Sequence, residues 1–321
     1  MHNKDMTTLK KNINLLRCPK TNQSLKLIDN KLISSDKRNM YEIEKSRIPI
    51  FFEDKSFSNT SIQKDHYNTI YKTYVENLAY PHTIEYTNYL DKKFINLIKK
   101  EKFNVFLELC CGSGEGIKLF NKNYKYALGI DISINMLNEA YQSKSSSKVQ
   151  FIQGDAINLP LKDSTIDCLV MLGGIHHIPN RNKLFKEVNR VLKSDGVFLW
   201  RDPVDDFVIW RLIRKIIYKI SPLLDEKTEE PLRFNITKTQ LSQNGLELQK
   251  WNTIGFFGFC LFMNSDVLLF NKVFRKIPKI RSIVKGFTKV DEFITNLSFM
   301  KNKGLIVIGM AKKKDQKEKS L

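Results

Sequence analysis

The stretch 105–116 is the feature that most constrains how this chain can fold. It reads Val-Phe-Leu-Glu-Leu-Cys-Cys-Gly-Ser-Gly-Glu-Gly, so an apolar run gives way to glycines at alternate positions. The apolar run is typical of a buried parallel strand, and the apolar residues at 117, 119 and 120 that follow have helical spacing. A strand, a glycine turn and a helix start together present backbone N–H groups and the positive end of a helix dipole to a ligand.

Spacing separates the nucleotide-binding motifs that share this layout. The dinucleotide fingerprint needs a small residue where this chain has Ile117, and no Gly-Lys-Ser/Thr follows to make a P-loop. The remaining pattern, Glu108 four residues before Gly112, resembles the first motif of the class I S-adenosylmethionine (SAM)-dependent methyltransferases, with Cys110 in place of the first of three alternate glycines. The resemblance covers residues 64 to 202 and is of the type found in ubiquinone and menaquinone biosynthesis.

Two more predicted strands end in an acidic residue. Asp131 follows the apolar run 126–130; the resemblance implies that it binds both ribose hydroxyls of SAM, whereas the residues alone also allow it to cap the next helix. Asp155 follows the run 149–153, and the resemblance implies that it binds the adenine amine. The cofactor-binding set that the resemblance implies is Glu108, Gly112, Gly114, Asp131, Ile132, Asp155, Ala156 and Gly173.

A pair of histidines follows the fourth predicted strand, 168–171. His176 and His177 would lie at the carboxyl end of that strand, which faces the ligand crevice in an open parallel sheet. An imidazole there can remove a proton from the methyl acceptor, or the pair can simply shape the loop. Trp210 and Tyr80 are further candidates for the acceptor side.

The fold class expected is α/β: a Rossmann-like methyltransferase sheet of seven strands, mostly parallel with the last strand antiparallel. The later strands are predicted at 197–200, 246–248 and 305–308. The predicted domains are a small β-rich module over 1–58, a methyltransferase domain over 64–315 with helical insertions at about 204–235 and 252–300, and a charged tail over 312–321.

The N-terminal module, residues 1–58, resembles the tRNA-methyltransferase-activator family of zinc-ribbon-like domains in its segments Leu16-Arg17-Cys18-Pro19 and 47–51. A zinc knuckle needs cysteines in C-x-x-C pairs. Cys18 is followed at that spacing by Thr21, and the next cysteine is Cys110, so we expect no metal.

The two insertions contain basic amphipathic segments. Over 207–220 the helical spacing places Phe207, Trp210 and Ile213 on one face, and 272–287 repeats the arrangement with Pro278 as an interruption. We expect a lid whose apolar face covers the substrate while its lysines face water, with contact to an anionic membrane surface as the second interpretation.

Composition adds expectations about partners. The 321 residues carry a formal net charge of +19, which indicates either an anionic partner or a lysine-rich surface that faces only water. Five irregularly spaced cysteines make no disulfide framework, and the first residues are polar. We therefore expect a cytoplasmic protein, peripheral at the inner membrane face if the second interpretation of the insertions holds.

The resemblance predicts a SAM-dependent methyltransferase that acts on a small-molecule acceptor, either apolar or lipid-linked. SAM carries its own activated methyl group, so the reaction rests on holding the acceptor in line and excluding water. One alternative is an rRNA or tRNA methyltransferase, which the net charge favours, although Asn/Asp-Pro-Pro-Tyr/Phe signatures of base methylation are absent. The other is a non-catalytic SAM-binding partner protein.

Overall fold

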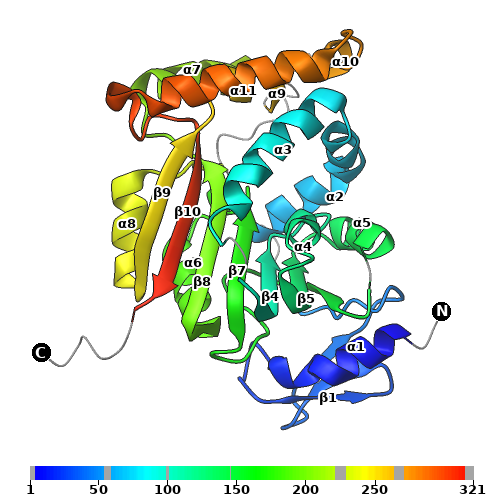
Figure 1. The fold of residues 1–321 in the computed structure, drawn as a ribbon. Helices are drawn as coiled ribbons and strands as arrows, with labels where there is room; N and C mark the ends of the chain where they lie inside the picture. Colours follow the sequence, from blue (N-terminus) through cyan, green and yellow to red (C-terminus); the bar gives the residue numbers. More distant parts are fainter. Residues whose placement is uncertain are drawn as a thin grey trace, which may run out of the picture.

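Two sheets organise the chain in the computed structural model, which describes residues 4–53, 59–98, 101–144, 146–220, 229–263 and 271–314 (Figure 1). The large sheet has the strand order β6-β5-β4-β7-β8-β10-β9. Its strands are β4 (Phe103–Leu109), β5 (Tyr124–Asp131), β6 (Val149–Gln153), β7 (Ile166–Leu172), β8 (Leu192–Pro203), β9 (Leu246–Ile254) and β10 (Ile306–Lys313). The first five strands of this order, from β6 through β5, β4 and β7 to β8, are parallel. Strand β10 runs antiparallel to both of its neighbours, β8 and β9. This confirms the expected α/β fold class.

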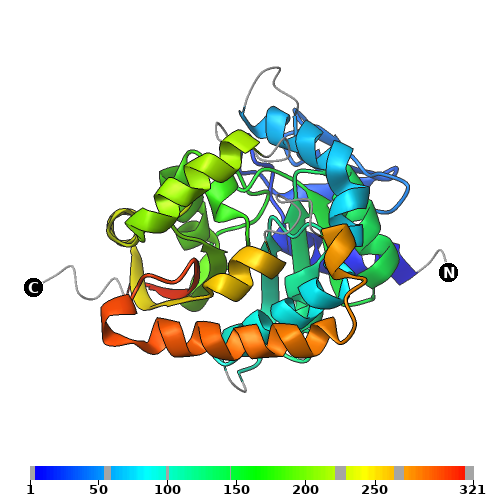
Figure 2. The ribbon, with the colours of Figure 1, turned by 90° about the horizontal axis from the view of Figure 1, so that it is seen from above.

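Helices cover both faces of the large sheet and its upper end. The bounds are α1 (Lys4–Asn12), α2 (Asn59–Leu78), α3 (Pro81–Ile95), α4 (Glu115–Leu119), α5 (Ile134–Lys144), α6 (Arg181–Val191), α7 (Val208–Ile220), α8 (Phe234–Gln243), α9 (Phe257–Phe262), α10 (Asn271–Phe274) and α11 (Ile280–Asn296). Side chains of α6 and α8 pack on one face, and those of α3, α4 and α5 on the other. Seen from above, α7, α9 and α11 form a layer over the carboxyl ends of the parallel strands (Figure 2).

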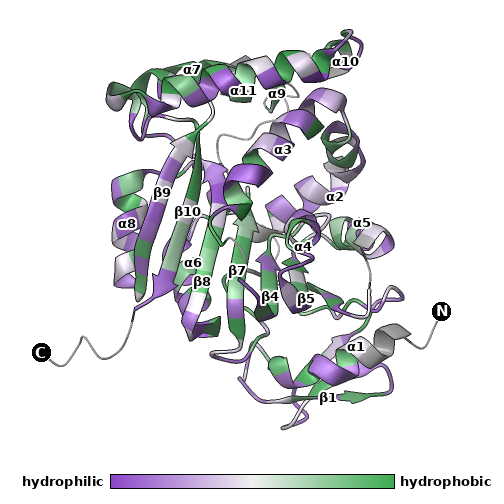
Figure 3. Ribbon diagram, viewed as in Figure 1, coloured by the Kyte–Doolittle hydropathy of each residue, from purple (hydrophilic) through white to green (hydrophobic). Residues whose placement is uncertain are grey.

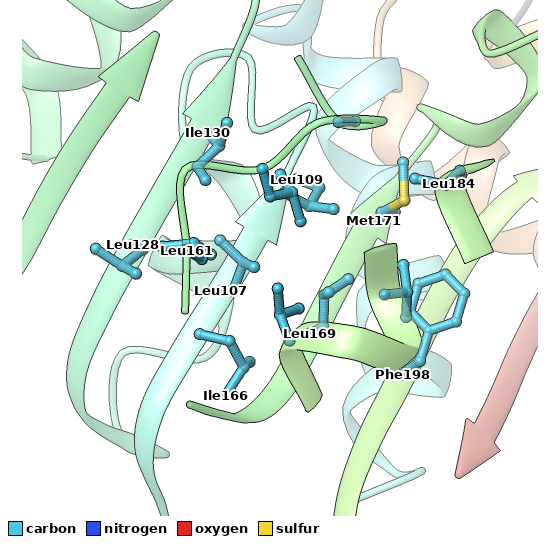
Figure 4. Close-up of a cluster of buried hydrophobic side chains, with 14 of the residues drawn as sticks. Leu107, Leu109, Leu128, Ile130, Leu161, Ile166, Leu169, Met171, Leu184 and Phe198 are labelled. Atoms are coloured by element: carbon cyan, nitrogen blue, oxygen red, sulfur yellow. The ribbon is translucent and has the colours of Figure 1, made fainter. Parts of the chain in front are cut away.

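The core follows from the period of two along each strand. Successive residues of a strand point to opposite faces, so Leu107 and Leu109 pack on the α6 side while Phe106 packs on the α4 side. Figure 4 shows Leu107 and Leu109 beside Leu169 and Met171 of β7. The green colour of β7 and β8 in Figure 3 marks the apolar runs that both faces of a covered parallel strand require.

The small sheet lies at the edge of the large one. It consists of β1 (Leu25–Ile28), β2 (Lys31–Ser34) and β3 (Met40–Glu42), close to the predicted strands. The segment that follows β3 in the sequence pairs with β6. The Phe51 N–H donates to the Gln153 carbonyl at 2.8 Å, and the Gln153 N–H donates to the Pro49 carbonyl at 2.9 Å. The N-terminal segment thereby covers the edge strand β6, whose backbone groups would otherwise be open to pairing with another chain.

A buried carboxylate joins α11 to α9 and to α3. Asp291 of α11 accepts hydrogen bonds from the Tyr86 hydroxyl at 2.7 Å and from the Gly258 N–H at 3.0 Å. Around it pack Phe259 and Phe262 of α9. The aromatic side chains of α9 are thus partly buried beneath α11.

Several predicted boundaries differ from the structure. The part of the predicted charged tail beyond 314 lies outside the described residues, and residues 312 and 313 belong to β10. Strand β9 runs to Ile254 rather than stopping at 248, because β10 pairs with it along its length. In the described part of the chain, no helix meets the length and apolarity that a bilayer span requires.

Candidate active site

A cavity of about 290 Å³ opens where the parallel strands end. Its walls come from the residues that directly follow β4, β5, β6 and β7, together with α2 and the loop before α6. The lining residues are Gln63, Tyr67, Cys110, Gly112, Ile130, Asp131, Ile132, Met136, Gly154, Asp155, Ala156, Ile157, Leu172, Gly173, Gly174, His177, Ile178, Pro179 and Asn180. The carboxyl end of an open parallel sheet is where ligands bind in folds of this class.

Asp131 joins the glycine turn to the end of β5. One carboxylate oxygen accepts from the Gly112 N–H at 2.8 Å and the other accepts from the Ser133 N–H at 2.8 Å. Burial raises the pKa of Asp131, and the hydrogen bonds from Ser133 and Gly112 oppose that rise. Each carboxylate oxygen has a further lone pair, so Asp131 can accept two more hydrogen bonds from a ligand in the cavity.

Asp155 lines the cavity on the next loop. One of its oxygens accepts from the Ile157 N–H at 3.1 Å, and the Gly154 N–H before it donates to the Asp131 carbonyl at 3.0 Å. The described lining therefore contains two carboxylates, and it includes neither lysine nor arginine. A cavity with this charge favours a cationic ligand that also has hydrogen-bond donors.

Glu108, by contrast, lies outside the lining. Its buried carboxylate accepts from the Gly116 N–H at 2.7 Å and from the Ile117 N–H at 2.8 Å, which are at the start of α4. Gly114, with φ of 79°, precedes α4 and is also absent from the lining. Because a carboxylate suits the positive end of a helix, Glu108 fixes the glycine turn to β4.

Cys110 occupies the position that a glycine takes in the family pattern. Its φ is 50°, in the left-handed region that costs a residue with a Cβ about 1 kcal/mol or more. We expect Cys110→Gly to be about 1 kcal/mol more stable than Cys110→Ala, because both lose the sulfur and only alanine keeps the strain. Urea unfolding of the two variants measures the difference; an alanine variant as stable as the glycine variant would contradict it.

The two predicted catalytic histidines have different surroundings. His177 lines the cavity, and its Nε2 is 2.7 Å from the Tyr67 hydroxyl. His176 is absent from the lining: its Nδ1 is 2.8 Å from an oxygen of buried Asp202, whose carboxylate also accepts from the Ile175 N–H at 2.9 Å. His176 and Asp202 thus hold the loop that places His177.

The surroundings of His177 favour its neutral form. Burial, together with the nearby His176 and His66, lowers its pKa well below the usual 6.5. Because the unfolded chain binds a proton at His177 more readily, we expect the free energy of unfolding to fall as the pH drops below about 6.5, by up to about 1.4 kcal/mol per pH unit from this group. Urea unfolding at several pH values should show a shallower dependence in His177→Gln; equal slopes would contradict the assignment.

Two lining residues from α2 were not predicted. Gln63 and Tyr67 reach the cavity because Asn68, next to Tyr67, accepts from the Ser133 hydroxyl at 2.6 Å and its carbonyl accepts from the Asn135 side chain at 3.0 Å. These contacts join segments about 65 residues apart, so no local pattern reveals them. Among the other acceptor-side candidates, Trp210 and Tyr80 are both buried and lie outside the lining.

Within the residues that the structure describes, no group of three or more His, Cys, Asp or Glu side chains is arranged to hold a metal ion. Cys18, in the N-terminal segment, lies 3.0 Å from the Tyr41 hydroxyl.

Part of the chain is similar in sequence to known methyltransferases. The methyltransferase domain family matches residues 107–200. Demethylmenaquinone methyltransferase of Staphylococcus carnosus is 32% identical over 110 residues, which cover 33% of this chain and 46% of that protein. The chain thus spans about half the length of the curated relatives it matches.

Two solved structures show the same fold at low identity. The [4+2]-cyclase SpnF has a TM-score of 0.57 at 14% identity, covering 80% of this chain and 97% of that one. A SAM-dependent methyltransferase from Thermotoga maritima has a TM-score of 0.52 at 17% identity, covering 78% and 99%. Residues 107–200, which contain the glycine turn, Glu108, Asp131 and Asp155, match the methyltransferase domain family, and the chain has a Rossmann-like methyltransferase fold.

Proposed function

We propose that the chain is a SAM-dependent methyltransferase that acts on a small, apolar acceptor. The observation that carries the proposal is the charge of the cavity, whose lining as described has two carboxylates, Asp131 and Asp155, and no lysine or arginine. The sulfonium of SAM is a cation, and its ribose and adenine offer hydrogen-bond donors that carboxylates accept well.

The residues of the cavity fit such a ligand at several points. Asp131 would accept from the ribose hydroxyls with Ile132 beside it, and Asp155 would accept from the adenine amine while the Ala156 N–H approaches the ring. Gly173 has φ of 71°, and a Cβ placed there would find open space within 4 Å. Its missing side chain therefore leaves room for a ligand at the wall, whereas a Cβ at Gly112 would come within 3.1 Å of the Met136 Cε.

Bound SAM supplies the activated methyl group, so the chain itself must hold the acceptor, exclude water and receive a proton where the acceptor releases one. His177 suits the last role because it is neutral at physiological pH and contacts Tyr67, which also lines the cavity. Glu108, Gly114 and His176 act as positioning residues in this proposal, since their contacts fix the turn and the loop that form the walls.

The remaining lining favours an apolar acceptor. Beyond the proposed cofactor contacts it contains aliphatic residues from three loops, among them Leu172, Ile178 and Pro179. Several curated relatives are named demethylmenaquinone methyltransferase, so apolar quinols are the first acceptors to test. A cavity wall without cations offers little to the phosphates of RNA, in spite of the net charge of +19.

Transfer of labelled methyl groups tests this function. The purified chain is incubated with SAM labelled in its methyl group. One sample receives an extract of lipids and quinones that has been reduced with dithionite, and the other receives total RNA. We expect label in the organic phase and formation of S-adenosylhomocysteine. Label in RNA would support the nucleic-acid alternative, and SAM binding without S-adenosylhomocysteine formation with any extract would support a non-catalytic partner protein.

A further inference from the structure

Helix α7 turns Trp210 and two of its arginines toward the protein. Arg211 is 3.1 Å from a carboxylate oxygen of Asp205 and also donates to the Asp205 carbonyl at 2.7 Å. Arg214 donates to the Val204 carbonyl at 3.3 Å and lies over the ring of Trp210. These two arginines therefore lie on the inner side of the helix, where Asp205 and two carbonyl groups bind them.

The outer side of α7 is aliphatic as a consequence. Val208, Leu212 and Ile216 recur at intervals of four residues, so they share one face. Their exposed fractions are 59%, 57% and 59%, and Ile209 beside them is 58% exposed. Aliphatic residues that are more than half exposed and recur along one helix face are unusual on a protein surface. They indicate an interaction site.

The same helical layer exposes further apolar side chains. Phe257 at the start of α9 is 52% exposed, and Phe293 of α11 is 68% exposed. Figures 1 and 2 show α7, α9 and α11 together at the top of the molecule, and Figure 3 shows green segments at that surface. We call the outer side of this layer, defined by Val208, Ile209, Leu212, Ile216, Phe257 and Phe293, the apical surface.

Basic residues dominate the exposed charges of α7 and α11. Lys215 of α7 is exposed, as are Arg281 and Lys289 of α11. Helix α7 contains no acidic residue, and the two of α11 are Asp291, which is buried, and Glu292, which is salt-bridged to Lys93. Exposed aliphatic and aromatic side chains among uncompensated cations match the boundary between the acyl chains and the headgroups of an anionic bilayer.

We propose that the apical surface docks the protein on an anionic lipid bilayer. A second copy of the chain is a poorer occupant, because a two-fold interface over this surface would bring Lys215 and its equivalents close to cations of the other copy. Docking here also turns the carboxyl ends of β4, β5 and β7 toward the bilayer (Figure 1). Docking could also bring an acceptor that resides in the bilayer to the cavity, and this consequence rests on the proposed function. The docking itself does not depend on that function.

Vesicle flotation tests the docking without any turnover. The full chain is mixed with vesicles of phosphatidylcholine alone or with phosphatidylglycerol added, in the absence of SAM. We expect flotation with the anionic vesicles that weakens as salt rises. The variant Val208→Ser/Leu212→Ser/Ile216→Ser should lose at least about tenfold in its partition coefficient, since three aliphatic side chains no longer enter the bilayer. Lys215→Glu/Arg281→Glu should lose a similar factor on anionic vesicles only.

A matched control uses three exposed apolar residues outside the layer. Ile28→Ser/Met40→Ser/Ile236→Ser changes side chains of β1, β3 and α8 that are 44%, 56% and 43% exposed, and it should float like the wild type. SAM affinity measured on each variant separates this test from the proposed function, because docking variants should bind SAM normally. Absence of flotation, flotation that the aliphatic triple variant leaves unchanged, or a dimer that this variant dissociates would overturn the proposal.

Discussion

An Asp131→Ala variant is expected to bind SAM about 100-fold more weakly than the wild type. Two hydrogen bonds from the ribose hydroxyls to a carboxylate would be lost, and bonds of this kind contribute roughly 1.5–3 kcal/mol each. The variant also releases the Gly112 N–H, which the carboxylate holds at 2.8 Å in the glycine turn. Isothermal titration calorimetry with SAM and with S-adenosylhomocysteine measures the loss, which should be similar for both ligands because both contain the same nucleoside.

Two further variants make the Asp131 result specific. Asp131→Asn keeps the shape but replaces one acceptor with a donor, so it should lose a large part of the affinity as well. Asp195→Ala removes an exposed carboxylate near the start of β8, and it should bind SAM like the wild type. If the Asp131→Ala protein is folded and its affinity for SAM is unchanged, the proposed ribose contact is contradicted.

The second large effect concerns the stability of the glycine turn. Glu108→Ala should lower the free energy of unfolding by about 4 kcal/mol, because the Gly116 and Ile117 N–H groups would be left buried without their acceptor. Glu108→Gln keeps one acceptor oxygen, so it should cost about 2 kcal/mol. Urea unfolding monitored by circular dichroism provides both values.

Ligand binding by the glutamine variant separates the two roles considered for Glu108. If the residue only positions the turn, the folded Glu108→Gln protein should bind SAM within about tenfold of the wild type. A much larger loss of affinity in a variant of nearly wild-type stability would instead favour the direct contact with the methionine end that the family pattern implies.

The parts of the fold that were predictable rest on short-range patterns. Strands β4 to β7 are apolar runs that end in a polar residue or a glycine, and this pattern lies within a few consecutive residues. The placement of Asp131 and Asp155 at one cavity follows from it, because the carboxyl ends of neighbouring parallel strands meet at one edge of the sheet. Their roles toward a cofactor remain predictions.

What the sequence did not reveal depends on contacts between distant segments. The 3.6-residue period of 207–220 predicts two faces of a helix but does not show which face packs against the protein. In the structure, Asp205 binds Arg211 and Arg214 and thereby determines the orientation of the helix. Tyr67 reaches the cavity through Asn68 and its contacts with α5. The family resemblance implies that Glu108 binds the methionine end of SAM, and this role stays a prediction; the contacts of its carboxylate with the Gly116 and Ile117 N–H groups could not be predicted from the sequence.

The most direct test of the account is a crystal structure of the chain with S-adenosylhomocysteine. We predict that the nucleoside occupies the cavity at the ends of β4, β5 and β6, with its ribose hydroxyls on the Asp131 carboxylate and its adenine amine on Asp155. Density for the ligand elsewhere on the protein, or a ribose turned away from Asp131, would contradict the central claim.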